Sequence, residues 1–134
     1  MRTKLYVFVA GLGLLATGAP MMAHHSFTAE YDAAKPVTLT GTVTKVEWMN
    51  PHARFYIDVK DDAGAVTNWE LELGSPNALM RLGWTRNSLK PGEMVSVEGS
   101  LAKDGSKLAN ARKVTLADGH KIFAGSAADS ENKQ

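Results

Sequence analysis

Three of the four histidines in the chain stand where they could bind a metal ion. His24 and His25 are adjacent near the N-terminus, and His52 follows Asn50 and Pro51 in a turn that the proline makes stiff. Imidazole nitrogen suits copper(II), zinc and nickel, and copper(II) binds such ligands most tightly among the divalent first-row metals. The chain has no cysteine, so a site for these metals must use histidine or methionine instead of thiolate.

The first 23 residues have the pattern of a secretory leader. Arg2 and Lys4 give a positively charged start, residues 5–19 are mostly apolar, and Ala23 is a small residue suited to peptidase cleavage. The apolar segment is short and broken by glycines, whereas a membrane-spanning helix needs about 20 apolar residues. We therefore predict that residues 1–23 are a signal peptide. The mature protein is then periplasmic or secreted, with no stable membrane span.

Cleavage after Ala23 would make His24 the first residue of the mature protein. Its free α-amine and ring Nδ1 could then chelate one metal ion, with His52 and His25 as further ligands. Cleavage after Met22 would instead leave Ala23-His24-His25, whose amine, two amides and imidazole bind copper(II) or nickel(II) in a square plane. A retained leader would remove both possibilities. The simpler alternative is that His24 and His25 form a polar terminus and His52 is an ordinary turn residue.

Chain length and net charge predict one small domain that does not bind nucleic acid. Removal of 23 residues from 134 leaves 111, a usual size for a single hydrophobic core. Arg2 and Lys4 depart with the leader, so the mature chain carries 13 basic and 14 acidic residues and a net charge of −1. Such a balance offers no electrostatic surface for nucleic acid or an anionic membrane.

The periodicity of apolar residues predicts an all-β domain with one short helix. Ser75 and Pro76 begin the helix, Leu79 and Leu82 form its apolar face, and Gly83 ends it. The predicted strands are residues 36–48, 52–60, a third around Trp69–Leu73, a fourth around Val95–Leu101, a fifth through Val114 and Leu116, and a short piece at 121–123. A one-residue slip of the apolar phase before Val46 predicts a β-bulge in the first strand.

Five strands with one helix between the third and fourth predict an OB-like Greek-key barrel over residues 24–123, followed by a disordered tail at 124–134. A different small β-barrel is the alternative. Glu70 and Glu72, on one face of the third strand, are expected to face water. OB ligands usually meet the loops joining strands one to two and four to five. Trp48 and Tyr56 could therefore wall a site at the first of these loops, and Asn50 could orient a histidine ring.

The segment before the first strand decides whether His24 and His25 stay near the barrel. Phe27 and Tyr31 are its large apolar residues, and we expect them to pack against the barrel. The alternative is that residues 24–35 fray, as chain termini often do.

Several short motifs together resemble an uncharacterised family of small secreted bacterial proteins, a domain of unknown function. The shared elements are the His-His-Ser-Phe motif at 24–27 and the segments 36–43, 50–52, 74–77, 83–86 and 89–92. The resemblance covers almost the whole mature chain and implies export and an OB-like fold, but it implies no activity. His120 lies outside these motifs.

Three classes of function follow from these residues. The first is a metal-binding carrier, chaperone or sensor that uses His24, His25 and His52, with copper as the metal and zinc or nickel as alternatives. The second is a metal-free ligand- or protein-binding module, with a periplasmic protein as its partner and Trp48, Tyr56 and Arg54 on its binding face. An enzyme is the least supported, because no nucleophile or carboxylate pair stands beside a histidine with a catalytic pattern.

The site of leader cleavage decides which residue begins the mature protein. Intact-mass measurement of the protein recovered from the exported fraction should give a chain that begins at His24. A chain that begins at Ala23 would support the alternative square-planar terminal site. A mass that includes Met1 to Ala23 would contradict both.

Overall fold

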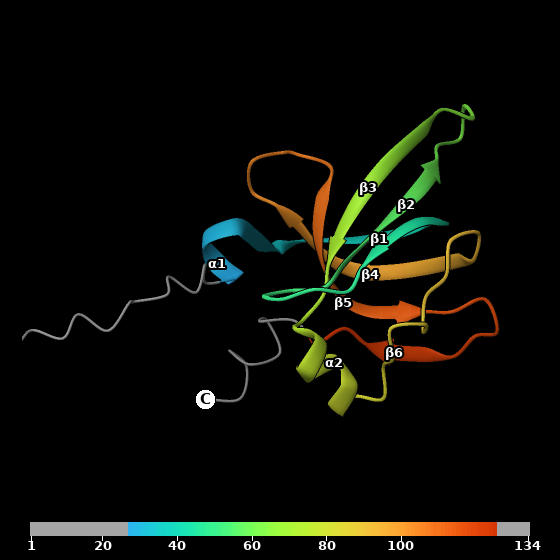
Figure 1. Cartoon of the computed structure of the whole chain (residues 1–134). Helices are drawn as coiled ribbons and strands as arrows, with labels where there is room; N and C mark the ends of the chain where they lie inside the picture. The colour runs from blue at the N-terminus through green and yellow to red at the C-terminus, as the bar shows by residue number, and fades with distance from the viewer. Residues whose placement is uncertain (1–26, 126–134) are drawn as a thin grey trace, which may run out of the picture.

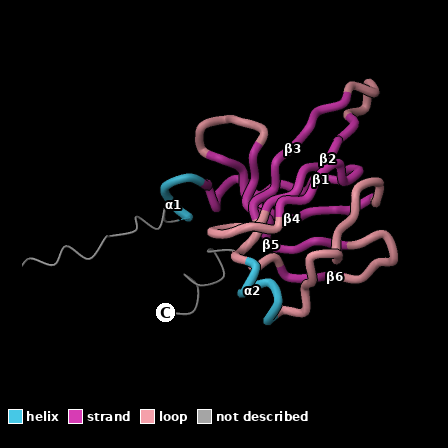
Figure 2. The backbone as a smooth tube through the Cα atoms, in the orientation of Figure 1, coloured by secondary structure: helices cyan, strands magenta, loops and turns pink. Residues whose placement is uncertain are grey.

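A computed structural model describes residues 27–125 (Figure 1). The predicted leader, His24, His25 and residues 126–134 lie outside the described residues. Most of the described chain is strand (Figure 2). The elements are α1 (Phe27–Glu30), β1 (Tyr31–Glu47), β2 (Arg54–Lys60), β3 (Val66–Glu72), α2 (Pro76–Arg81), β4 (Met94–Ala102), β5 (Leu108–Thr115) and β6 (Lys121–Phe123).

The first five strands close into a ring, which confirms the predicted OB-like barrel. β1 pairs with β2 on one side and β4 on the other, β2 pairs with β3, and β4 pairs with β5, all antiparallel. A short parallel pairing between β3 and β5 closes the ring. β6 extends the sheet beyond β5 as a sixth strand. Closure leaves few free edges, which protects a small β domain from edge-to-edge association.

β1 is a long, bent strand that pairs with a different strand along each of its two parts. Its earlier part pairs with β4 and its later part with β2, and the register with β2 shifts between Val43 and Lys45. This irregularity confirms the bulge predicted from the slipped apolar phase. The strand starts at Tyr31, five residues before the predicted Pro36. The extension follows from pairing of Tyr31 with Ala102 of β4.

The core fills the barrel and is closed at one end by α2. The largest fully buried side chains come from the inward positions of β1 to β5, with Leu73 and Leu79 beside them: Val43, Phe55, Ile57, Leu71, Leu73, Leu79, Val95, Val97 and Val114. The predicted helix signals hold, since Ser75 Oγ accepts from the Ala78 amide and Gly83 has a φ of +94° after the helix. Leu82 differs from the prediction. It caps the helix and is 47% exposed, so Pro76 and Leu79 are the residues that the helix buries.

The folded domain continues past the predicted boundary after Phe123. Ala124 is fully buried, its amide donates to the Arg112 carbonyl, and its carbonyl accepts from the Gly74 amide. The prediction of a tail starting at Ala124 was therefore wrong at its first residues. The sequence gives no sign of this burial, because Ala124 is held by hydrogen bonds of its backbone and not by its side chain.

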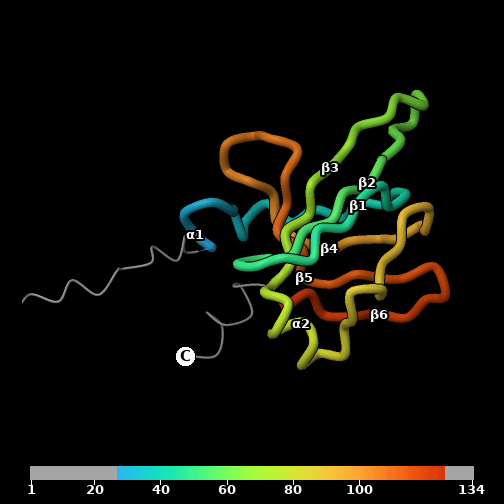
Figure 3. The backbone as a smooth tube through the Cα atoms, in the orientation of Figure 1, coloured from blue at the N-terminus to red at the C-terminus, as the bar shows by residue number. Residues whose placement is uncertain are grey.

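The terminal segment packs against the barrel, so the alternative that it frays is wrong from Phe27 onward. Phe27 and Tyr31 stack with ring centroids 5.6 Å apart and form a second apolar cluster with Ala102 and Leu108. α1 lies beside the loop between β4 and β5, as Figure 3 shows. In that loop, Lys103 donates its backbone amide to the Glu30 carbonyl at 2.9 Å and its ammonium to the Thr28 carbonyl.

The close approach of β4 to β5 generates a prediction for stability. A Cβ atom at Gly99 would lie 2.1 Å from the Asn110 carbonyl oxygen, so Gly99→Ala must push two paired strands apart. We expect it to lower the free energy of unfolding by about 3 kcal/mol in urea denaturation. Gly64→Ala is the matched control, because that turn has open space and only its φ of +84° opposes alanine, at about 1 kcal/mol. Equal losses from the two variants would contradict the steric explanation.

Candidate functional site

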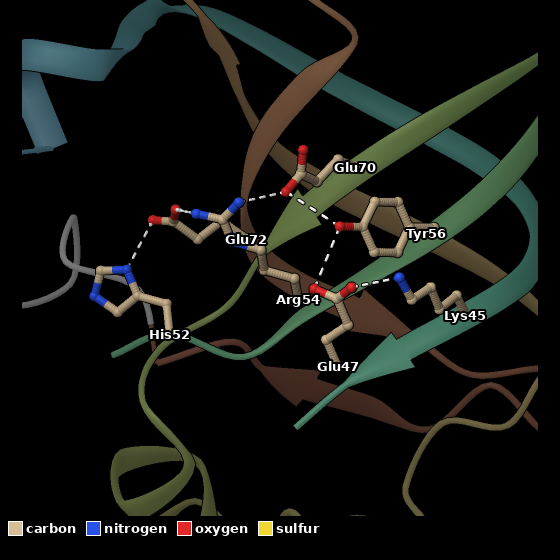
Figure 4. Close-up of polar contacts among 7 residues, drawn as sticks. All are labelled: Lys45, Glu47, His52, Arg54, Tyr56, Glu70 and Glu72. Carbon is tan, nitrogen blue, oxygen red and sulfur yellow. Dashed lines mark hydrogen bonds and ion pairs between the residues drawn. The ribbon is translucent and has the colours of Figure 1, made fainter. Parts of the chain in front are cut away.

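A row of charged and polar side chains crosses the outer face of the barrel on β1, β2 and β3 (Figure 4). Strand register places these residues together: Arg54 of β2 pairs with Glu72 of β3 and Glu47 of β1, while Tyr56 pairs with Glu70 and Lys45. Because side chains alternate across a strand, residues paired in this way share one face. The partners Phe55 and Leu71 take the opposite face, in the core.

Arg54 holds both glutamates of β3. Its Nη1 donates to Glu70 Oε1 at 2.5 Å, and its Nη2 donates to Glu72 Oε2 at 3.4 Å. The prediction that both glutamates face water was wrong, since Glu72 is only 5% exposed and Glu70 is half-buried. A buried carboxylate must be paired or hydrogen-bonded to be tolerated, which gives the guanidinium its structural role.

His52 contacts the same buried carboxylate from the other side. Its Nδ1 lies 3.2 Å from Glu72 Oε1, and its side chain is 39% exposed. When the imidazole is neutral, this contact places the proton on Nδ1 and leaves the lone pair of Nε2 for another partner. A carboxylate that orients a histidine in this way is the usual neighbour of a metal-binding imidazole. Glu72 therefore prepares His52 to act as a ligand through Nε2.

Tyr31, at the start of β1, is buried together with Phe27 of the terminal segment. The tyrosine is 2% exposed. Its hydroxyl is the one buried side-chain polar atom without a hydrogen-bond partner among residues 27–125. Burial, together with the nearby negative charges of Glu72 and Glu30, raises the pKa of the Tyr31 phenol well above its ordinary value. An unpartnered buried hydroxyl costs about 1–3 kcal/mol, so its position requires an explanation.

The rest of the row is more exposed. Tyr56 Oη lies 3.4 Å from a carboxylate oxygen of both Glu47 and Glu70 and can donate its proton to one of them at a time. Lys45 binds Glu47 at 2.5 Å, and this hydrogen-bonded ammonium holds the pKa of the Glu47 carboxyl below its ordinary value. Exposed pairs of this kind contribute little to stability. They nevertheless leave the face with mixed charge instead of a basic groove.

The structure separates the residues that the sequence grouped around the first loop. Trp48 packs against the main core, whereas Tyr56 lies in the outer polar row, so the two do not wall a common site. Asn50 is exposed and makes no side-chain hydrogen bond within residues 27–125, so it does not orient His52. Glu72 takes that role. His120 lies in the turn between β5 and β6, where its backbone bonds with Leu116 and Asp118.

Sequence reasoning placed Arg54 on a binding face but missed Glu72 as its partner in this site. One local signal was available, because counting outward from the turn at Asp61–Ala65 pairs Arg54 with Glu72. The described part of the chain contains no group of three histidine, aspartate or glutamate side chains that could hold a metal by itself. Within the same range, neither helix has the length or apolar content to cross a membrane.

A hollow of about 430 Å³ lies next to this row. It is bounded by α1, by the start of β2 and by the loop between β4 and β5, with Ala29, Glu30, Arg54, Lys103 and Asp104 as its lining residues. Two of these side chains are acidic, Glu30 and Asp104, and two are basic, Arg54 and Lys103. This is the region where OB-folds usually meet a ligand.

Comparison with known proteins places the chain in a family. The model of DUF6152, a family of unknown function, matches residues 11–111. The chain belongs to the DUF6152 family. Comparison with curated proteins gives no match. The mitochondrial single-stranded DNA-binding protein Rim1 of S. cerevisiae is similar in structure, with a TM-score of 0.49 and 12% identity over 62% of this chain and 93% of that one.

Burial of Tyr31 predicts a loss of stability in alkali for this DUF6152 protein. Above about pH 10, tyrosine ionises in the unfolded chain, while folded Tyr31, with its raised pKa, keeps its proton. The folded state then binds more protons than the unfolded state. Stability must therefore fall as pH rises, by up to about 1.4 kcal/mol per pH unit for this group. Urea denaturation at increasing pH measures this slope.

Tyr31→Phe should reduce, without abolishing, the fall of the free energy of unfolding with rising pH in alkali. Some slope remains because burial and neighbouring carboxylates also raise the pKa of Tyr56. An unchanged slope in Tyr31→Phe would show that Tyr31 is not the group responsible.

Proposed function

We propose that this protein is an exported transition-metal-binding protein that uses its mature N-terminus together with His52. It acts as a carrier, chaperone or sensor, with copper as the first candidate metal and zinc or nickel as alternatives. The observation that carries the proposal is the contact of His52 Nδ1 with buried Glu72, which leaves Nε2 as a ready nitrogen ligand. His24 and His25, if exposed by leader cleavage, supply the other nitrogens.

The anchoring of the terminal segment supports this proposal. Phe27 is buried against Tyr31, and Ala29 and Glu30 of the same segment border the hollow that Arg54 also lines. Arg54 binds Glu72, the carboxylate that contacts His52. His24 is three residues before Phe27, and three residues span at most about 10 Å. The mature amine and the His24 ring are therefore tethered to the part of the barrel that carries His52. A free tail without such an anchor would lack this proximity.

The chemistry of the donors favours copper. An α-amine and two or three imidazoles form an all-nitrogen set, which binds copper(II) more tightly than the other divalent metals of the first row. The outer face brings no cysteine thiolate and no oxygen cage of the kind that selects magnesium or calcium. Its carboxylates, Glu47, Glu70 and Glu72, are occupied by Lys45, Arg54 and His52. This mixed charge also supports a role away from nucleic acid, since phosphates require a cationic surface.

A second candidate function is a metal-free ligand- or protein-binding module. The hollow beside Arg54 and Lys103 favours it, because it lies where OB barrels usually bind and presents charges of both signs. Its ligand would be a small zwitterion or a charged segment of a periplasmic protein. Metal titration distinguishes the two functions.

The test is calorimetric titration of the mature, tag-free protein with copper(II). We expect one tight site. His24→Ala, His52→Ala and a Gly-Ser extension of the N-terminus should each weaken it by more than about 100-fold, since loss even of a ligand's neighbour costs about 10- to 100-fold. His120→Ala is the matched control, because that exposed histidine lies in a turn between β5 and β6 and its loss should leave the affinity unchanged.

Two outcomes would contradict the metal site. Equal losses from His24→Ala and His120→Ala would show that binding is spread over surface histidines. Absence of stoichiometric binding of any divalent metal would favour the second candidate function instead.

A further inference from the structure

We propose that Arg54 is a positioning residue for His52: its guanidinium holds the Glu72 carboxylate in the orientation that meets the imidazole. The consequence for metal affinity rests on the proposed function, in which His52 is a metal ligand. The positioning itself does not, because it concerns the metal-free protein.

The contacts of Arg54 form a continuous row between Glu70 and His52 (Figure 4). Arg54 Nη1 donates to Glu70 Oε1 at 2.5 Å, and Nη2 donates to Glu72 Oε2 at 3.4 Å. The other oxygen of Glu72, Oε1, lies 3.2 Å from His52 Nδ1. Each oxygen of the Glu72 carboxylate therefore meets a different partner, and rotation of the carboxylate would disturb both contacts.

The Glu72 carboxylate needs an external partner to fix its plane. The last torsion of a glutamate side chain joins a tetrahedral to a planar carbon and has broad preferences, so the rotamer alone does not direct the oxygens. His52 is poorly placed to direct them, because it lies in the loop before β2 and its side chain is 39% exposed. Arg54 belongs to β2 and stands directly across from Glu72 in the register of β2 with β3. The strand residue therefore fixes the carboxylate, and the carboxylate orients the loop residue.

The second carboxylate, Glu70, gives the guanidinium of Arg54 a definite direction. Glu70 lies two residues before Glu72 on the same face of β3, a diagonal position that a long side chain reaches. A guanidinium is planar and its N–H groups point in fixed directions, so the bond of Nη1 to Glu70 determines where Nη2 points. A lysine ammonium is a compact charge with rotatable donors and imposes no such geometry. Neutralisation of charge alone would not require arginine at this position.

Burial makes the orientation of Glu72 matter. Its side chain is 7% exposed, so water has little access to take the place of a protein partner. If the carboxylate turns, the acceptor in front of His52 Nδ1 moves away and solvent does not replace it. The proton can then move to Nε2, the nitrogen that the proposed metal site needs unprotonated.

The test reads the His52 tautomer in the metal-free protein by ¹⁵N NMR of the imidazole rings, at a pH above their protonation. Wild type should show the proton mainly on Nδ1. Arg54→Lys keeps the charge but removes the planar pair of donors, and it should shift His52 toward a mixture of the two tautomers. Lys113→Met is the matched control, because it breaks a partly exposed ion pair with Glu98 between β4 and β5 and should leave His52 unchanged.

The tautomer separates positioning from a merely structural role. If Arg54 only neutralised buried charge, Arg54→Lys would change at most the urea midpoint of unfolding. An unchanged His52 tautomer in the folded variant would therefore overturn the inference, and so would a wild-type proton on Nε2.

Wild type alone supplies a second measurement that does not depend on the folding of a variant. The two Nη groups of Arg54 should give separate ¹⁵N signals at low temperature, because each binds a different carboxylate. A single averaged signal would show a freely turning guanidinium and would overturn the inference.

Copper(II) titration of Arg54→Lys gives the functional arm. We expect affinity to fall about tenfold, the lower end of the range for a residue that acts through a ligand's neighbour. Absence of copper binding in wild type would overturn the proposed function while leaving the tautomer result intact. Unchanged copper affinity with a changed tautomer would overturn the bearing of Arg54 on the metal.

Discussion

The buried carboxylate of Glu72 is the constraint on which the rest of the outer face depends. A charge removed from water must find partners, and removal of one partner leaves the others with an uncompensated charge. Its partners come from separate parts of the chain: Arg54 from β2 and His52 from the loop before it. Strand register and loop position therefore meet at one side chain.

In this barrel, the chain itself occupies part of the region where OB-folds usually bind a ligand. The face of β2 and β3 and the loop between β4 and β5 are where such barrels commonly hold an external ligand. Here α1 lies beside that loop, and Phe27 and Tyr31 fill part of the region with the protein's own chain. What remains open is the edge around His52 and the hollow beside Arg54. Both proposed functions place the ligand at this remaining edge.

The contacts of the buried Glu72 carboxylate distinguish residues that support the fold from the one residue that could bind a ligand. Arg54 neutralises buried charge, and the more exposed Lys45–Glu47–Tyr56 group continues the row without a buried charge to support. His52 contacts the same buried carboxylate as Arg54 and is equally exposed, but its imidazole keeps a ring nitrogen that can bind a ligand, whereas a guanidinium offers only donors. An imidazole that is oriented on one side and open on the other is suited to bind a ligand. Trp48 and Asn50 flank it in sequence but do not share its environment.

Much of the fold followed from local patterns in the sequence. Alternation predicted the strands, a phase slip located the bulge between Val43 and Lys45, and Ser75, Pro76 and Gly83 marked the ends of α2. These features are local because they depend on the period of a strand and on backbone preferences of single residues. The histidine in the stiff turn was also identifiable from its neighbours alone.

The partners of His52 were decided only by tertiary structure. Alternation correctly put Glu70 and Glu72 outside the barrel core, but it could not show that Glu72 is buried. Likewise, Ala124 carries no sequence signal for the backbone contacts that bury it. Burial of a surface position depends on which distant segment lies over it. The period of a strand reports which way a side chain points, and only the packed chain determines whether water is there.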